Sequence, residues 1–125
     1  KHLKRAGLDY WHLVKVHYHD SFADVQQQYT GSPFYFCTTK AKHSYSDIVY
    51  TSDSILVFGK ETAGLPEPLL AANEERTIRI PMQAGARSLN LSNAVAVVAY
   101  EALRQNAFAD LCLSGTGCHG GTDTI

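Results

Sequence analysis

The stretch LVFGKETAGLPE (56–67) contains the residue types that chemistry beside a strand end would need. The first of its two carboxylates, Glu61, lies between Gly59 and Gly64. A glycine at a strand end lets a ligand lie directly against the backbone, and glycine readily adopts positive φ. The alternative is an ordinary strand-to-helix turn with a surface Lys60–Glu61 pair, which stabilises a fold only slightly. The loop alone leaves both readings open.

A second polar cluster stands at the start of the long apolar helix pattern in ARSLNLSNAVAVVAYEALRQ (86–105). Ser88, Asn90 and Ser92 all suit a helix N-terminus, where side-chain oxygens accept hydrogen bonds from free backbone N–H groups. One cap needs only one such residue, so the surplus of hydroxyl and amide groups indicates a binding or catalytic site. A well-capped core helix is the competing explanation.

Short apolar runs alternate with helix patterns along the rest of the chain. We predict strands at 13–19, 34–37, 54–58 and 77–81. We predict helices at 22–29, 66–75 and 90–105. This alternation is typical of an α/β fold in which helices cover both faces of a parallel sheet. Ligands bind such sheets at the carboxyl ends of the strands, so the loops after Cys37, Phe58 and Ile80 predict one site along one edge.

Composition narrows the possible functions. A hydrophobic content of 45% predicts one domain with a real core, and a net charge of −1 gives no overall attraction to nucleic acid, although a local basic patch remains possible. Neither G-x-G-x-x-G nor G-x-x-x-x-G-K-[ST] occurs, so dinucleotide and P-loop chemistry are not supported. No apolar run approaches the roughly 20 residues of a membrane span. We therefore expect no membrane partner.

The cysteines and the two chain ends carry weaker signals. Cys37, Cys112 and Cys118 include no C-x-x-C pair, and Cys118-His119 alone is a weak metal signal. We expect no metal and a reduced, cytoplasmic protein. The opening KHLKRAGLDYW is typical of the end of a helix, so we expect that this sequence starts within a longer chain. We predict a folded domain over 1–108 and a flexible or non-native tail over 109–125.

The sequence resembles the SpoU branch of the SPOUT methyltransferases. FGKETAGLPE, IRIPM and RSLNLSNAVAVVAYEA are similar to motifs 2 and 3 of that branch. KRAGLDYW and CTTK are similar to segments of its small, single-domain tRNA wobble-position (cytidine/uridine) 2′-O-methyltransferases. The resemblance covers about residues 3–106.

The resemblance implies a C-terminal deep trefoil knot that holds S-adenosyl-L-methionine, although knots are exceptional in proteins. Carried over by position, the cofactor-binding residues are Cys37, Thr38, Gly59, Ile80, Ser88 and Leu89. The residues linked with catalysis on the acceptor side are Glu61, Ser88 and Asn90. The implied reaction is methyl transfer to the ribose 2′-OH of the anticodon wobble nucleotide of tRNA.

The resemblance also implies a homodimer that pairs through its first and last helices. Here the N-terminal strand and helix, with an N-x-G-N-x-x-R-like motif, are missing from the expected pattern. A non-catalytic RNA- or cofactor-binding remnant of the fold is therefore the alternative function, and a nucleotide-binding regulator without a phosphate loop is a weaker one. The expected partner is the anticodon stem-loop of tRNA. Basic residues could contact its phosphates, or they could form only a solvated surface; they are Lys1, Lys4, Arg5, Lys40, Lys42 and Arg87.

Overall fold

The computed structural model describes residues 14–60, 63–86 and 89–115. The chain divides after Gly31 into two compact units, which we describe separately. In the first unit, α2 (Phe22–Gln28) begins at Ser21, whose Oγ accepts a hydrogen bond from the backbone N–H of Asp24 at 3.2 Å. The helix predicted after this serine is therefore confirmed.

The strand predicted at 13–19 is wrong for the residues that the structure describes. Residues 14–19 adopt no strand, and their side chains are exposed. The β-branched composition of this stretch favours extended backbone, but a strand also requires a hydrogen-bonded neighbour. Composition alone could not supply that partner.

The second unit contains a four-stranded sheet with the order β2-β4-β1-β3. Its strands, all of them parallel to their neighbours, are β1 (Phe34–Cys37), β2 (His43–Ser44), β3 (Ile55–Val57) and β4 (Thr77–Arg79). In the middle of the sheet, Phe36 is paired with Val57 on one side and Thr77 on the other. The predicted parallel sheet and three of its strands are confirmed.

The edge strand β2 and the 3₁₀ turn η2 (Tyr45–Asp47) after it were not predicted. His43 lies opposite Ile78 of β4, in a stretch of polar residues without alternating pattern. Such a short edge strand is set by its pairing with β4 rather than by its own sequence. Sequence signals for it are therefore weak.

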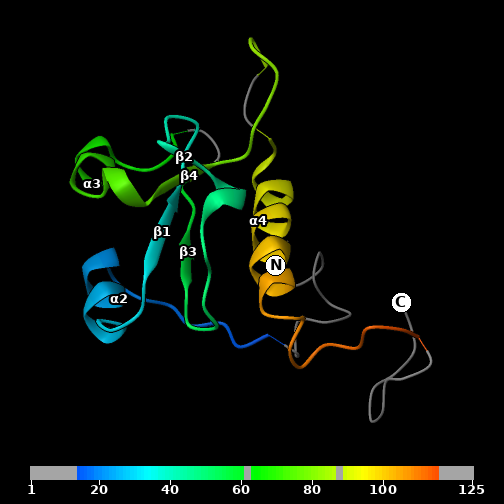
Figure 1. Cartoon of the computed structure of the whole chain (residues 1–125). Coiled ribbons are helices and arrows are strands. Elements are labelled where there is room, and N and C mark those ends of the chain that lie inside the picture. The colour runs from blue at the N-terminus through cyan, green and yellow to red at the C-terminus, as the bar shows by residue number, and fades with distance from the viewer. Residues whose placement is uncertain (1–13, 61–62, 87–88, 116–125) are drawn as a thin grey trace, which may run out of the picture. The chain divides into compact units, whose positions relative to one another are not determined.

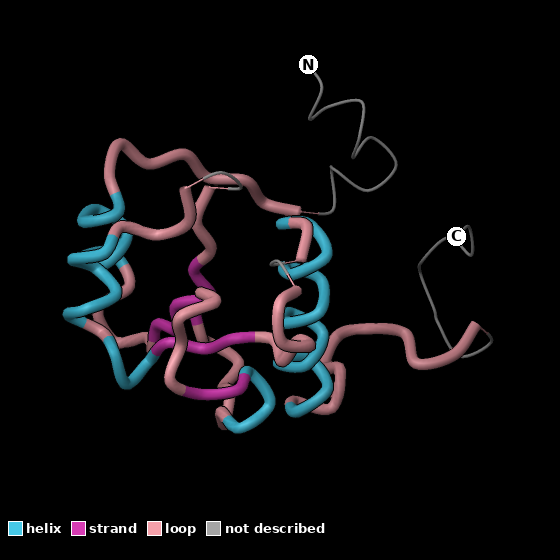
Figure 2. Tube along the Cα trace, turned by 90° about the horizontal axis from the view of Figure 1, so that it is seen from above, coloured by secondary structure: helices cyan, strands magenta, loops and turns pink. Residues whose placement is uncertain are grey.

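The helices of this unit are α3 (Glu67–Ala72), the 3₁₀ turn η3 (Glu74–Arg76) and α4 (Leu91–Gln105). Figure 1 shows α3 and α4 on opposite sides of the sheet, and the view from above in Figure 2 shows α4 running along one side of the magenta strands. Phe36, Ile78 and Val98 are fully buried in the core. Helices therefore cover both faces of the sheet, as the sequence predicted.

The C-terminal end of α4 is joined to the loop before β3 by amide side chains. Gln105 accepts a hydrogen bond from the backbone N–H of Tyr50 and donates one to the carbonyl of Ile48, both at 2.9 Å. Asn106 donates to the carbonyl of Tyr50 at 3.2 Å. This clamp fixes α4 against the sheet at the end opposite its N-terminus.

The same end of α4 contains an ordered ion pair. Arg104 donates from Nε and Nη2 to the two carboxylate oxygens of Glu101, each at 3.0 Å, and Gln105 donates to Glu101 at 2.8 Å. The bonds from Arg104 and then from Gln105 lower the pKa of Glu101 to about 2 from an ordinary value of 4.5. Ionised Glu101 thus stabilises the fold above pH 4.5, and this stabilisation is lost as the pH falls towards 2.

Three apolar side chains of α4 remain accessible, and the first of them, Val95, is 38% exposed. Val97 is 36% exposed and Tyr100 is 60% exposed, although the ring of Tyr100 lies 6.5 Å from that of Phe108.

After the helix, Cys112 is disulfide-bonded, whereas we expected reduced cysteines from the sequence; Cys37 is a free thiol. In the described part of the chain, no helix is both long and apolar enough to cross a membrane.

Candidate functional site

A cleft of about 320 Å³ opens at the carboxyl ends of the central strands. Its walls come from the loops after β1, β3 and β4, from the start of α3 and from the N-terminal turn of α4. These are the three strand-end loops that the sequence pointed to, because parallel strands end at the same edge. The structure thus brings them together in one concave site.

The cleft contains most of the residues predicted to bind a cofactor. Those that line it are Cys37, Thr38, Gly59, Ile80 and Leu89. Glu61 and Ser88 lie outside the described residues, and Asn90 stands between two lining residues, Leu89 and Leu91. Their binding and catalytic roles remain predictions.

Gly59 is required by a close approach of the chain to itself. A Cβ at this position would lie 2.5 Å from the backbone N of Leu65 and 2.6 Å from the carbonyl oxygen of Gly64, far inside contact distance. From the sequence we expected the glycine to make room for a ligand. In the structure, the atoms it makes room for belong to the other end of the same loop.

Gly64 serves the same loop through its backbone conformation. Its φ of 68° lies in the left-handed region, and its N–H donates to the carbonyl of Lys60 at 2.9 Å. The prediction of positive φ here is confirmed. The two glycines together fold the loop after β3 back on itself at the mouth of the cleft.

The loop after β1 is held by hydrogen bonds to β4. The backbone N–H of Thr38 donates to the carbonyl of Ile78 at 2.9 Å, and that of Lys42 donates to the buried Oγ1 of Thr77 at 3.0 Å. Arg79 adds a bond from Nη1 to the carbonyl of Thr39 at 3.1 Å. This wall of the cleft is therefore fixed by polar contacts along its length.

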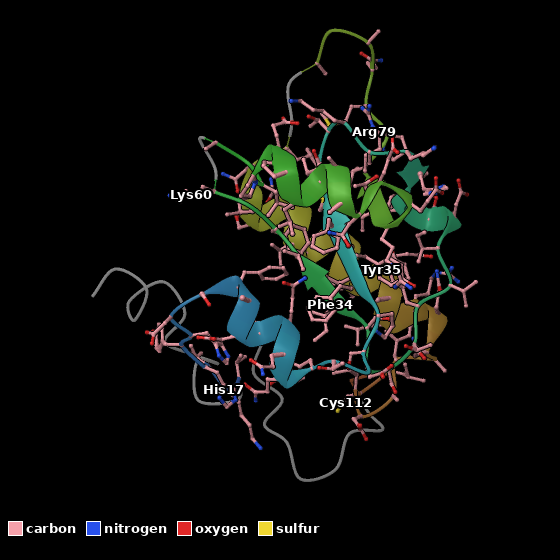
Figure 3. The ribbon with its side chains drawn as sticks, turned by 90° about the vertical axis from the view of Figure 1, so that its left-hand side faces the viewer. His17, Phe34, Tyr35, Lys60, Arg79 and Cys112 are labelled. Atoms are coloured by element: carbon pink, nitrogen blue, oxygen red, sulfur yellow. The ribbon has the colours of Figure 1, made fainter. Side chains whose placement is uncertain are left out.

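Charged side chains line the outer part of the cleft. Lys40 is paired with Glu67 at the start of α3, and both side chains are 69% exposed. Arg79 and Lys60 also line the cleft, and Figure 3 shows these two on either side of α3. Sequence reasoning singled out neither of them as a site residue, although Arg79 directly precedes the predicted contact Ile80.

Cys37 forms part of the inner wall. Burial raises the pKa of its thiol, so the group stays protonated and uncharged at neutral pH. A neutral thiol suits contact with an apolar or aromatic ligand group and does not suit a nucleophile, which requires the thiolate. The described residues contain no group of His, Cys, Asp and Glu side chains that could hold a metal ion.

Asn90 caps α4 at the edge of the cleft. Its Oδ1 accepts hydrogen bonds from the backbone N–H of Ser92 at 2.9 Å and from the Ser92 hydroxyl at 2.6 Å. The predicted cap is therefore confirmed, and Asn90 is the residue that provides it. The carbonyl half of its amide is occupied in the cap, which leaves the NH₂ group as the part that could meet a substrate.

The sequence that forms this sheet and cleft matches a methyltransferase family. The profile of the SpoU rRNA Methylase family matches residues 1–100, so the chain is a member of that family. A protein of Listeria innocua, provisionally named a tRNA (cytidine(34)-2′-O)-methyltransferase, is 54% identical over 114 residues, which are 89% of this chain and 68% of that protein.

Two solved structures are similar in fold as well as sequence. One, described as giving structural insights into the 2-OH methylation of C/U34 on tRNA, has a TM-score of 0.78 and 42% identity over 85% of this chain and 69% of its own. The other is the SpoU methyltransferase AviRb from Streptomyces viridochromogenes in complex with the cofactor AdoMet. It has a TM-score of 0.56 and 28% identity over 70% of this chain and 35% of its own.

Proposed function

We propose that this protein is an S-adenosyl-L-methionine-dependent tRNA 2′-O-methyltransferase that acts on the ribose of the anticodon wobble nucleotide. The observation that carries the proposal is a cleft at the carboxyl edge of the sheet that five of the residues predicted to bind the cofactor line together. The family membership supports methyl transfer. The relatives whose names specify nucleotide 34 of tRNA support this substrate.

The residues of the cleft fit such a cofactor. Its volume of about 320 Å³ falls at the small end of ligand pockets, which span roughly 300–1,000 Å³. Cys37, Ile80 and Leu89 give the cleft uncharged side chains that suit a base, and Lys40, Lys60 and Arg79 give it charged ones. When bound, the cofactor supplies an electrophilic methyl group on a sulfonium.

The chain's own contribution is orientation of the acceptor hydroxyl. We place Glu61, Ser88 and Asn90 on this side of the reaction, as the resemblance implies. The NH₂ group of Asn90 is available for a hydrogen bond to a ribose oxygen, because the cap uses only its Oδ1. Holding the hydroxyl in line with the methyl group converts an encounter into an oriented reaction, a large part of most enzymatic accelerations.

Other features of the proposal come from the family resemblance. They are a trefoil knot threaded through the C-terminal part of the fold, a homodimer and a cytoplasmic location. The accessible Val97 and Tyr100 on the outer side of α4 support the dimer. The tRNA named for the relatives supports the location.

The test is methyl transfer from labelled S-adenosyl-L-methionine to a synthetic anticodon stem-loop. We expect label at position 34 and none on a matched stem-loop with 2′-deoxyribose at that position. Asn90→Asp keeps the capping oxygen and removes the NH₂ group, so we expect it to lower the transfer rate about 10²-fold while leaving cofactor affinity unchanged. A chain that binds the demethylated cofactor but transfers no methyl would instead support the non-catalytic remnant.

A further inference from the structure

Arg79 has hydrogen-bonding capacity that the described residues leave unused. In the residues that the structure describes, its guanidinium makes one hydrogen bond, from Nη1 to the carbonyl of Thr39 at 3.1 Å. No described carboxylate lies within 4.0 Å of it. A guanidinium carries five N–H donors and a permanent charge, so most of its donors face the cleft or solvent.

The neighbouring cations differ from Arg79 in this respect. Lys40 is paired with Glu67, and Lys42 is paired with Glu75 at 2.9 Å. Lys42 does not line the cleft. Of these three cations on the β1 loop and β4, Arg79 is the one that both lines the cleft and lacks a described carboxylate partner.

The position of Arg79 is well fixed. It is the last residue of β4, and its side chain is partly buried. The bond to Thr39 ties the guanidinium to a loop that Thr38 and Lys42 also attach to β4. A planar fork held in this way loses little further entropy when it binds a ligand, which favours tight recognition.

We propose that Arg79 binds an oxyanion in the cleft. This proposal rests on the proposed function, under which two oxyanions come to this edge of the sheet. One is the carboxylate on the methionine part of the cofactor, and the other is a phosphate beside the acceptor ribose of the RNA. Both match the two parallel N–H donors of a guanidinium.

The experiment compares Arg79→Gln with Arg76→Gln, a matched loss of one arginine at an exposed position outside the cleft, in the whole chain. Calorimetry measures affinity for S-adenosyl-L-homocysteine and for its decarboxylated analogue. Fluorescence anisotropy measures affinity for an anticodon stem-loop at several salt concentrations. We expect Arg79→Gln to weaken the binding of one of the two ligands about 10- to 100-fold, the usual effect of a lost charge-assisted bond, and Arg76→Gln to change neither affinity to that extent.

The pattern of loss identifies the anion. A carboxylate contact is supported if Arg79→Gln weakens the binding of S-adenosyl-L-homocysteine and leaves the binding of its decarboxylated analogue unchanged. A phosphate contact is supported if stem-loop affinity falls and its salt slope decreases by about one. Equal weakening of both small ligands without a change in the salt slope means that Arg79 only supports the loop, and it overturns the proposal, as does unchanged affinity throughout. Failure of the wild-type chain to bind either ligand would instead reject the proposed function as well.

Discussion

The two loops that wall the cleft are held in different ways. The loop after β1 is attached to β4 through Thr38, Arg79 and the buried hydroxyl of Thr77, so its shape depends on polar bonds. The loop after β3 is shaped by backbone packed against backbone at Gly59 and Gly64. A polar network loses its bonds one at a time, whereas a steric contact fails as soon as one carbon is added.

This difference explains why the shape of one loop could be predicted from the sequence and that of the other could not. Two glycines directly after an apolar run are a clear sequence signal, because each indicates a turn or a close approach of the backbone. Gly59 was predicted to make room for a ligand, which stays a prediction, and the structure adds that it makes room for Leu65 and Gly64. The hydrogen bonds of the β1 loop involve threonine and backbone groups from distant parts of the chain, and these leave no pattern in the sequence.

The largest expected effect is at Gly59. Gly59→Ala places a Cβ against the backbone of Gly64 and Leu65, so the loop must open. We expect the free energy of unfolding to fall by about 3 kcal/mol, the upper part of the range for overpacking, and affinity for S-adenosyl-L-homocysteine to fall with it. Urea denaturation and calorimetry measure the two effects.

Gly64→Ala is the matched control in the same loop. A Cβ there meets no atom within 4 Å, so the change adds only the strain of a positive φ, about 1 kcal/mol. Equal destabilisation by the two alanines would mean that the contact at Gly59 does not shape the loop.

The second prediction concerns the polar wall. Thr77→Val keeps the shape of a side chain that is 4% exposed, but removes a hydroxyl that accepts from Lys42 and donates to the carbonyl of Glu74 at 2.7 Å. We expect a loss of about 2 kcal/mol, because both partners lose a bond in a partly buried site. Thr39→Val, at an exposed position of the loop after β1 whose hydroxyl makes no hydrogen bond to the described residues, serves as the control and should change stability by less than about 0.5 kcal/mol.

The third prediction uses the cap of α4, where the cleft meets a helix rather than a loop. Asn90→Ala removes the oxygen that accepts from Ser92, and we expect a loss of about 1 kcal/mol in thermal unfolding. Asn90→Asp should retain nearly all of the stability, since it keeps the capping oxygen. A similar loss from both changes would show that the cap depends on more than that oxygen.

The sequence predicted the cleft better than it predicted the residues that complete it. Apolar runs and turn residues placed β1, β3, β4 and α4, and parallel strands then had to end at one edge. The edge strand at His43, the fixed guanidinium of Arg79 and the absence of strand structure at 14–19 all depend on which segments become neighbours. Tertiary pairing of this kind has no local periodicity to reveal it.

The smallest expected effect is at the one described ion pair that joins the β1 loop to α3. Lys40 and Glu67 are both 69% exposed, so water screens their attraction and their flexible side chains lose entropy on pairing. We expect Lys40→Gln to lower the free energy of unfolding by less than about 1 kcal/mol, and this difference should shrink further in 0.5 M salt, as for any exposed pair. Paired urea titrations of the wild type and the variant at low and high salt measure it. A loss as large as that from Thr77→Val would mean that the β1 loop is held at its rim by charge, and that the contrast between a polar wall and a steric one is incomplete.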